Sequence, residues 1–367
     1  MKLFIFIFSL SGGGAERVAA NLANYWAQKG WDITVVTLAS RKLDFYELHP
    51  AVERVALELS GDSGNVLIGL KQNFQRIFML RRVLRQIKPD IALGMMTGAN
   101  VLLALAALGL SGLRTIGAER IHPPQMPLDY LWETLRHYSY RFLNAVTVLT
   151  SEGEVWIKNN TYAQKISLIP NAVTYPLLAQ EPRIKPNATE RKILLAVGRL
   201  DKQKGFDLLI ECLANLSSKY PDWDLIILGE GSLRSALEKK IHDLDLEKRI
   251  FLPGSVGNMG EWYESADLYV MSSRFEGFPN TLVEAMAYGL PAVSFDCDTG
   301  PRDIIRHEVD GLLVPVGDTV VLTTALDRLM GDKELRIRFS KYAVEVRERF
   351  SMEKIAGLWD QLFKEIL

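Results

Sequence analysis

Two glutamates, Glu276 and Glu284, lie eight residues apart in the stretch Arg274-Phe-Glu-Gly-Phe-Pro-Asn-Thr-Leu-Val-Glu284, which joins an apolar strand to a helix. A helix that starts at Asn280 and Thr281 presents unpaired backbone N–H groups and the positive end of its dipole, both of which favour a phosphate. One carboxylate precedes this helix start and the other lies inside the helix, so the two can hold hydroxyl groups on either side of the phosphate. A ligand with hydroxyl groups at both ends and phosphate in the middle is a nucleotide sugar, which is the hypothesis that this stretch raises.

A basic pair follows the strand predicted at Lys192–Val197, in the sequence Gly-Arg199-Leu-Asp-Lys-Gln-Lys204-Gly. At the carboxyl end of a strand, Arg199 and Lys204 can neutralise a diphosphate leaving group, arginine through a forked contact and lysine as a point charge. The alternative is a solvated basic loop, which is the usual fate of such charges. Their place at a strand end, like that of Glu276, favours the diphosphate.

A glycine loop, Ser11-Gly-Gly-Gly-Ala-Glu-Arg17, lies between the first predicted strand and the first predicted helix. Three glycines let the backbone approach a ligand closely, and the helix N–H groups point toward it. The loop is not a dinucleotide fingerprint, because Arg17 stands where a glycine is needed, and no Gly-Lys-Ser/Thr follows for a P-loop. A tight turn needed for packing alone is the alternative.

Strands and helices alternate through two arrays, and a length of 367 residues favours two domains. In the first array we predict helix Ala15–Lys29 and strands Lys2–Phe8, Asp32–Leu38, Ile91–Met95, Thr115–Ala118, Ala145–Leu149 and Lys165–Ile169. In the second array we predict strands Lys192–Val197, Asp224–Leu228, Arg249–Leu252, Leu268–Met271, Pro291–Phe295 and Gly311–Val314. The fold class is therefore α/β, with two doubly wound Rossmann-like domains facing a cleft, at 1–171 and 192–350. Three prolines mark 172–191 as the linker.

Composition limits the partners. A net charge of −1 argues against nucleic acid as a partner of the whole chain. Two cysteines without metal-ligand spacing fit reduced thiols in the cytoplasm. The apolar start at 2–8 enters a glycine loop, so it predicts a buried strand and not a signal peptide, and 91–110 predicts a buried strand and helix and not a membrane span.

The basic pair Arg199/Lys204, the Glu276–Glu284 element and the glycine loop together resemble family 4 glycosyltransferases with the GT-B fold, over essentially the whole chain. The resemblance implies retaining transfer from a nucleotide diphosphate sugar without a catalytic metal or other cofactor. It implies that Glu276 contacts donor-sugar hydroxyls, that Glu284 holds the ribose, and that the basic pair binds the diphosphate. It also implies that the terminal helix, at about 351–367, returns to the first domain. The implied donor-binding set is Gly13, Gly14, Arg199, Lys204, Glu276, Gly277, Phe278, Asn280, Thr281, Leu282 and Glu284, in which the backbone amides near Gly13, Gly14 and 280–282 face the phosphates.

An Asp-x-Asp pair, Asp296 and Asp298, follows a strand of the second domain. In other transferases such a pair holds a divalent metal. Because the family resemblance implies no metal, we interpret this pair as part of a loop that shapes the site.

His122 follows a predicted first-domain strand in Gly117-Ala-Glu-Arg-Ile-His122-Pro-Pro. A histidine there can shape the reaction zone or relay a proton, and we count it with Glu276, Arg199 and Lys204 as a catalytic candidate. Some relatives carry Glu-Arg-Asn in this loop, so Glu119 and Arg120 are equal candidates for the acceptor side. A lone histidine beside two prolines is more often structural.

The segment Lys71–Lys88 predicts a helix with an apolar face and six cations without one carboxylate. A core-packing helix with a solvated basic face is the alternative. Anionic lipid head groups or a lipid diphosphate are the natural partners of such a surface. A basic first-domain helix of this kind resembles that of enzymes that build undecaprenyl-diphosphate-linked glycans. The candidate cations for the acceptor or the membrane are Arg76, Arg81, Arg82 and Arg85.

The combined prediction is a retaining transferase that moves a hexose or N-acetylhexosamine from a UDP-sugar to a glycan acceptor. The expected acceptor is a polyprenyl-diphosphate-linked oligosaccharide of bacterial surface polysaccharide or glycoprotein glycan assembly. The expected location is the cytoplasmic face of the inner membrane, as a peripheral protein. Two alternatives stay open: a soluble GT-B transferase with a small-molecule or free-sugar acceptor, and a non-catalytic nucleotide-sugar-binding module.

Overall fold

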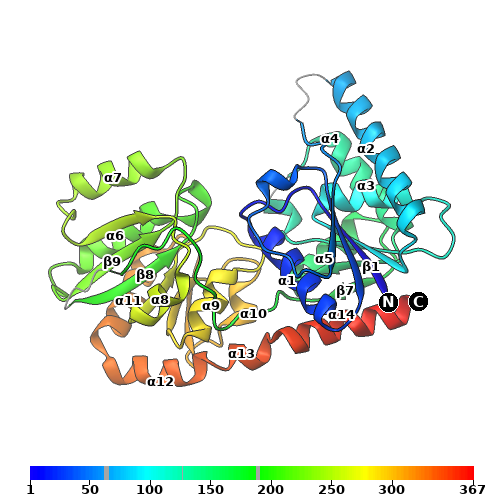
Figure 1. The fold of residues 1–367 in the computed structure, drawn as a ribbon. Coiled ribbons are helices and arrows are strands. Elements are labelled where there is room, and N and C mark those ends of the chain that lie inside the picture. Colours follow the sequence, from blue (N-terminus) through cyan, green and yellow to red (C-terminus); the bar gives the residue numbers. More distant parts are fainter. Residues whose placement is uncertain (62–65, 126, 187–190) are drawn as a thin grey trace. The chain divides into compact units, whose positions relative to one another are not determined.

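The computed structural model describes residues 1–61, 66–125, 127–186 and 191–367, and Figure 1 shows the elements that they form. The chain divides into two compact units. The first contains Met1–Ala172 and Met352–Leu367, and the second contains Val173–Ser351. Each unit is built around its own parallel sheet, so the predicted α/β class with two doubly wound, Rossmann-like halves is confirmed.

The first unit alternates strands with helices. Its strands are β1 (Lys2–Ile7), β2 (Asp32–Thr37), β3 (Val52–Ala56), β4 (Ile91–Met95), β5 (Arg114–Ala118), β6 (Ala145–Val148) and β7 (Ile166–Leu168). Its helices are α1 (Gly14–Gln28), α2 (Val66–Ile87), α3 (Thr97–Ala107), α4 (Tyr130–Ser139), α5 (Ser151–Asn160) and α14 (Met352–Ile366), with short 3₁₀ turns η1 (Arg41–Leu43), η2 (Pro123–Gln125) and η3 (Tyr140–Phe142). Within the described residues, no helix is long and apolar enough to cross a membrane.

The first sheet has the order β3-β2-β1-β4-β5-β6-β7, and all of its strand pairs are parallel. Strand β1 is buried from Leu3 to Ile7, as expected for a strand covered on both faces. The order changes direction between β1 and β4, the place where such sheets bind ligands at their carboxyl edge. Strand β3 was not predicted, because the edge sequence Val-Glu-Arg-Val-Ala lacks a clear apolar pattern.

The second unit repeats this plan. Its strands are β8 (Lys192–Val197), β9 (Trp223–Leu228), β10 (Ile250–Gly254), β11 (Leu268–Met271), β12 (Ala292–Phe295) and β13 (Gly311–Val314). Its helices are η4 (Lys202–Lys204), α6 (Phe206–Leu216), α7 (Arg234–Asp243), α8 (Met259–Ser265), α9 (Asn280–Ala287), α10 (Pro301–Ile304), α11 (Thr319–Gly331), α12 (Lys333–Ala343) and α13 (Val346–Arg349). The parallel sheet has the order β10-β9-β8-β11-β12-β13, so its direction changes between β8 and β11.

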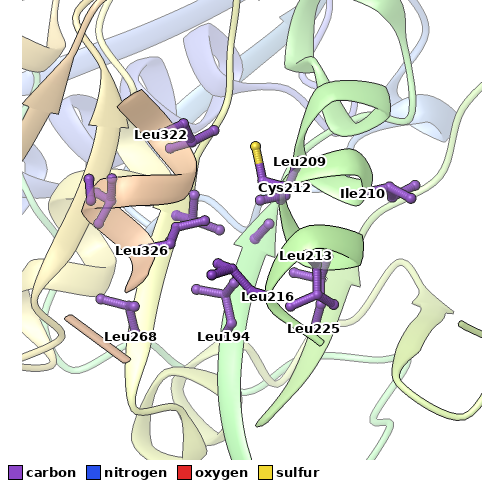
Figure 2. Close-up of a cluster of buried hydrophobic side chains, with 14 of the residues drawn as sticks. Leu194, Leu209, Ile210, Cys212, Leu213, Leu216, Leu225, Leu268, Leu322 and Leu326 are labelled. Carbon is purple, nitrogen blue, oxygen red and sulfur yellow. The ribbon is translucent and has the colours of Figure 1, made fainter. Parts of the chain in front are cut away.

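The second core lies between this sheet and the helices that cover it. Figure 2 shows Leu322 and Leu326 of α11 on one side of this core and Leu209, Cys212 and Leu216 of α6 facing them. The residues labelled there are Leu194, Leu209, Ile210, Cys212, Leu213, Leu216, Leu225, Leu268, Leu322 and Leu326. Most of them are completely buried, so this core fixes the strands from which the site loops leave.

The segment predicted as a linker, 172–191, is held against the second unit over its described residues. The Trp262 indole N–H donates to the Ile184 carbonyl at 2.9 Å, and the Leu177 N–H donates to the Tyr288 hydroxyl at 2.8 Å. The structure therefore places the change of unit at Ala172/Val173 and makes Val173–Lys185 part of the second unit. The prolines marked irregular backbone correctly, but irregular backbone is not the same as an unattached linker. Residues 187–190 of this prediction lie outside the described part.

Helix α14 belongs to the first unit, and Figure 1 shows this C-terminal helix, in red, beside α1. Trp359 is completely buried, and its ring meets Trp26 of α1 edge-on at 6.3 Å. The Trp26 indole N–H donates to Asp360 at 3.2 Å, and Lys165 pairs with Glu365 at 2.6 Å. These contacts attach the end of the chain to the first sheet's layer of helices.

Replacing Trp359 with alanine is expected to lower the free energy of unfolding of the first unit by about 3–5 kcal/mol, because a completely buried ring leaves a cavity. Urea unfolding followed by tryptophan fluorescence and by protease sensitivity of α14 measures this change. Leu358→Ala, at a 37% exposed position of the same helix, is the matched control. Equal unfolding midpoints for the two variants would show that Trp359 does not anchor α14.

Candidate functional site

The candidate site lies at the carboxyl ends of β8 and β11, which are neighbours in the second sheet. The loop after β8 carries Arg199 and Lys204, and the loop after β11 carries Glu276. Gly205 brings the two loops together: its φ is +63°, and a side chain there would collide with the Ser272 carbonyl. The chain can therefore turn from η4 into α6 against the end of β11 only with glycine at this position.

Hydrogen bonds join these two loops along their length. The Arg274 N–H donates to the Gln203 carbonyl at 2.7 Å, and the Gln203 side-chain amide donates to the Phe275 carbonyl at 2.9 Å. The Arg274 guanidinium donates to both oxygens of Asp207 at 2.9 and 2.7 Å. These bonds hold the pKa of Asp207 below its ordinary value, so the carboxylate stays charged and the loops stay attached at neutral pH.

Lys204 and Glu276, predicted separately, form an ion pair. The Lys204 Nζ lies 2.6 Å from Glu276 Oε1, and the two side chains are 16% and 8% exposed. The stem of Lys204 lies against Gly198, where a Cβ atom would lie 2.9 Å from its Cδ and Cε. The glycine before Arg199 therefore makes room for the lysine. The site therefore holds one positive and one negative charge together, both largely buried from solvent.

Arg199 has a different environment from Lys204. Its side chain is 76% exposed, and its Nε lies 3.3 Å from Asp201. A further contact to Gln203 is long, at 3.4 Å. Arg199 is thus a weakly held, solvated cation beside a fixed one, and it can turn toward an anion at low cost.

Glu284 is buried inside α9, one turn beyond the helix start. The Tyr263 hydroxyl donates to Glu284 Oε2 at 3.2 Å, and the Tyr269 hydroxyl donates to the Thr281 side chain at 2.9 Å. Burial raises the pKa of Tyr269, and the charges of Glu276 and Glu284 add to this. Glu284 and Thr281 of α9 are therefore each held by a tyrosine hydroxyl group.

The amides predicted to face a phosphate lie at the start of α9. The Leu282 N–H donates to the Pro279 carbonyl at 3.1 Å, and its contact with a phosphate stays a prediction. Asn280 and Thr281 stay the predicted amides at this helix start. Phe278 is buried and packs against Phe350 at 5.5 Å between ring centres, which fixes the turn before the helix. Gly277, in the same turn, stays a prediction as a donor contact.

The loop that contains Asp296 and Asp298 packs against the Glu276 loop and holds its backbone. The Thr299 hydroxyl donates to the Glu276 carbonyl, and the Cys297 thiol donates to the Ser273 carbonyl at 3.0 Å. Burial raises the pKa of Cys297 to about 12, so the thiol stays protonated. Asp296 accepts two hydrogen bonds from Arg302 at 2.9 and 3.1 Å. In the described part of the chain, no group of three or more His, Cys, Asp or Glu side chains is placed to hold a metal ion.

The glycine loop of the first unit follows β1 and leads into α1. Gly13 is the residue before the helix, and its carbonyl accepts from the Tyr46 hydroxyl at 2.9 Å. The Glu16 carboxylate lies directly against Gly13, so this helix start carries its own negative charge. The contact of Gly13 and Gly14 with a donor phosphate stays a prediction.

The three first-unit candidates follow β5 at the carboxyl edge of the first sheet. Glu119 is 3% and Arg120 is 6% exposed. Thr97 and Tyr140 donate hydroxyl hydrogen bonds to Glu119, while Arg120 donates to Asn171 at 3.0 Å and lies over the Trp359 ring. Glu119 is thus hydrogen-bonded within the first unit, whereas Nε and Nη2 of Arg120 are buried without a hydrogen-bond partner among the described residues. The acceptor-side roles of both residues stay predictions. His122 is half-buried in the following loop and stays a prediction.

Two of the four predicted basic residues of α2 are bound to the protein's own backbone. Arg81 donates to the Ala106 and Leu108 carbonyls at 2.7 and 2.6 Å, at the end of α3. Arg76 donates to the Leu59 carbonyl at 3.0 Å. Arg82 and Arg85 are exposed. The free cationic surface of α2 is therefore smaller than the sequence predicted, because Arg81 binds carbonyls at the end of α3 and Arg76 binds a carbonyl of the segment after β3.

Sequence reasoning missed the residues that connect the site loops: Gln203, Asp207, Arg274 in its structural role, Ser272 and Thr299. Their partners lie about 20 to 70 positions away, so no local spacing reveals them. The turn at Gly205 is the one feature that the sequence could have indicated, because glycine adopts a positive φ without steric cost and is common in turns.

Two family models match the chain and together span nearly all of it. The model of Glycosyltransferase Family 4 matches residues 12–175. The model of Glycosyl transferases group 1 matches residues 179–346. The first match covers most of the first unit and ends just inside the second. The second match lies within the second unit and contains every site residue from Arg199 to Glu284.

Two similar curated proteins come from Campylobacter jejuni. One is the N-acetylgalactosamine-N,N'-diacetylbacillosaminyl-diphospho-undecaprenol 4-alpha-N-acetylgalactosaminyltransferase, which is 29% identical over 97% of this chain and 97% of its own length. The other is an alpha-1,4-N-acetyl-D-galactosaminyltransferase that is also named for an undecaprenol-linked glycan, 26% identical over 100% of this chain and 99% of its own length.

Among solved structures, the Anabaena protein HepE in complex with UDP is similar to the whole chain. The TM-score is 0.79 at 18% identity, and the match covers 100% of both chains. At this identity the likeness establishes the fold alone.

The buried carboxyl group of Glu119 predicts a pH-dependent stability. Burial raises the pKa of Glu119, so between its unfolded and folded pKa values the folded state binds more protons and stability falls as pH rises. Glu119→Gln removes this loss, so the stability difference between wild type and variant should shrink, or reverse, from pH 5 to pH 8. Urea unfolding at both pH values measures this, and Glu47→Gln, at an exposed first-unit position, controls for the lost charge. If instead the stability advantage of the wild-type protein over the variant grew with pH, the folded state would stabilise the ionised form of Glu119, which contradicts the prediction.

Proposed function

Because the chain belongs to the glycosyltransferases described by the family 4 and group 1 models, and has the GT-B fold, we propose that it is a retaining enzyme that uses a UDP-sugar. The observation that carries this proposal is the buried Lys204–Glu276 pair at the switch point of the second sheet, beside the start of α9. HepE, of the same fold, binds UDP. The proposed donor is a hexose or N-acetylhexosamine nucleotide, and the proposed place of binding is the second unit, which carries this ion pair.

Each charged group of the site has a partner in such a donor. The diphosphate replaces Glu276 as the partner of Lys204 and recruits the exposed Arg199. Glu276, once released, accepts hydrogen bonds from hydroxyl groups of the sugar, and the buried Glu284 accepts from the ribose. Asn280 and Thr281 direct the positive end of α9 toward the phosphates.

The chemistry needs charge stabilisation at the leaving group. The bond between the sugar C1 and the diphosphate oxygen breaks, while an acceptor hydroxyl oxygen forms the new bond to C1 on the same face. The acceptor proton passes to the departing phosphate. Lys204, Arg199 and the α9 amides stabilise the negative charge that develops on the diphosphate, and no metal or other cofactor is assigned a role. His122 is the proposed first-unit residue near the acceptor.

The proposed acceptor is a polyprenyl-diphosphate-linked glycan of bacterial surface polysaccharide or glycoprotein glycan assembly, because two relatives are named for undecaprenol-linked glycans. Helix α2 supports a membrane location. Five exposed residues recur at helical spacing and form one stripe, which we call the α2 stripe: Lys71, Phe74, Phe78, Arg82 and Arg85. Aromatic rings beside cations match the surface of an anionic bilayer. The protein then works as a peripheral protein on the cytoplasmic face of the inner membrane.

Lys204→Ala and Glu276→Gln are each expected to lower sugar transfer about 100-fold, since each removes a fixed charge from the reacting diphosphate or sugar. Transfer from radiolabelled UDP- and GDP-sugars to an undecaprenyl-diphosphate-linked glycan measures this, with free sugars as a second acceptor. Lys202→Ala, an exposed lysine of the same turn, is the control and should keep the wild-type rate. Wild-type rates in both site variants would refute the site, and transfer to free sugars alone would refute the lipid-linked acceptor.

A further inference from the structure

An open groove lies at one edge of the first sheet, and the predicted site residues of the first unit, Gly13 and His122, lie at the other edge. Its volume is about 490 Å³, and its lining comes from the end of α2 and from the loop between α3 and β5. The lining residues Asp90 and Leu113 precede β4 and β5, whereas Gly13 and His122 follow β1 and β5. Since all these strands are parallel, the groove and the transfer residues occupy opposite edges. The groove is therefore a separate site.

The chemistry of the groove favours an anion. Arg85 and Lys88 line it, both are exposed, and neither is paired with another side chain in the described ranges. The carboxylate in the lining, Asp90, accepts from the Lys2 backbone N–H at 2.7 Å, so part of its negative charge is already engaged. Two unpaired cations that line one groove repel each other, and an anion bound there reduces this repulsion.

The loop between α3 and β5 contributes neutral donors to the lining. Ser111 contributes a hydroxyl group, and the flanking glycines leave the backbone of the loop open to a ligand. Across the described residues, the backbone N–H groups of Ser111 and Gly112 find no backbone acceptor. Cations together with hydroxyl and amide donors are the groups that bind a phosphate.

We propose that this groove binds the phosphate of an anionic phospholipid head group, which rests on the membrane location in the proposed function. Arg85 links the groove to the α2 stripe, because it belongs to both. Phe74 and Phe78 on that stripe are 71% and 67% exposed. Insertion of these exposed rings into the boundary between head groups and acyl chains removes their apolar surface from water. The groove can then hold a head group beside them. A free phosphate ion would give the rings no such partner, which is why a lipid is the favoured source.

The test compares two double variants in binding to phosphatidylcholine vesicles that contain phosphatidylglycerol. Arg85→Gln/Lys88→Gln removes two cations of the groove, and Lys71→Gln/Arg82→Gln removes two exposed cations of α2 outside the groove lining. If the cations act only through non-specific attraction to the vesicle, the loss of either pair weakens vesicle binding by on the order of 30-fold. If the groove binds a head group, the Arg85/Lys88 variant should lose about 10-fold more vesicle affinity than the Lys71/Arg82 variant. Equal losses would overturn the proposal.

Two further measurements separate the sources of phosphate and the two proposals. Inorganic phosphate at millimolar concentration should not displace the wild-type protein from the vesicles. Displacement together with amide shifts at Ser111 and Gly112 would mean a site for the free ion and would overturn the head-group assignment. UDP binding by the wild-type protein is measured in the same samples. Its absence would refute the proposed donor site and leave the groove untouched.

Discussion

The ion pair between Lys204 and Glu276 is the constraint on which the rest of the site depends. Both groups are largely withdrawn from water, and a buried charge without a partner is strongly destabilising. In the absence of a ligand, the two therefore satisfy each other. A donor that is to bind has to offer a negative group to Lys204 and hydroxyl groups to Glu276 at the same time. A nucleotide sugar has both features in adjacent parts of the molecule.

The scaffold serves to keep this pair in place. Strands β8 and β11 are neighbours because the sheet order changes direction between them, and the core of α6, α11 and the strands holds their ends (Figure 2). Gly205 lets the loops approach, and the Arg274–Asp207 pair keeps them attached. The Thr299 hydroxyl supports the Glu276 carbonyl from behind. None of these residues has to touch a ligand, yet each fixes the distance between the two charges.

The sequence predicted what depends on local pattern. Strand ends, the glycine turns and the eight-residue spacing of Glu276 and Glu284 are properties of short segments, and the fold class was confirmed. Contacts between distant segments could not be predicted. Arg81 reads as a free cation in its own helix, but a carbonyl 25 positions away binds it. The burial of Glu119 and the attachment of Val173–Lys185 to the second unit likewise depend on packing that appears only in the folded chain.

The exchange of partners by Lys204 is most directly tested by the affinity for UDP, which has the diphosphate but no sugar. Glu276→Gln removes the internal competitor of the diphosphate, so isothermal titration should show that this variant binds UDP as tightly as the wild-type protein or more tightly. Lys204→Ala should bind UDP about 10- to 100-fold more weakly, the loss expected for a contact to a charged group. If Glu276→Gln weakened UDP binding as much as Lys204→Ala does, the pair would act as one fixed unit, and the proposed exchange would be contradicted.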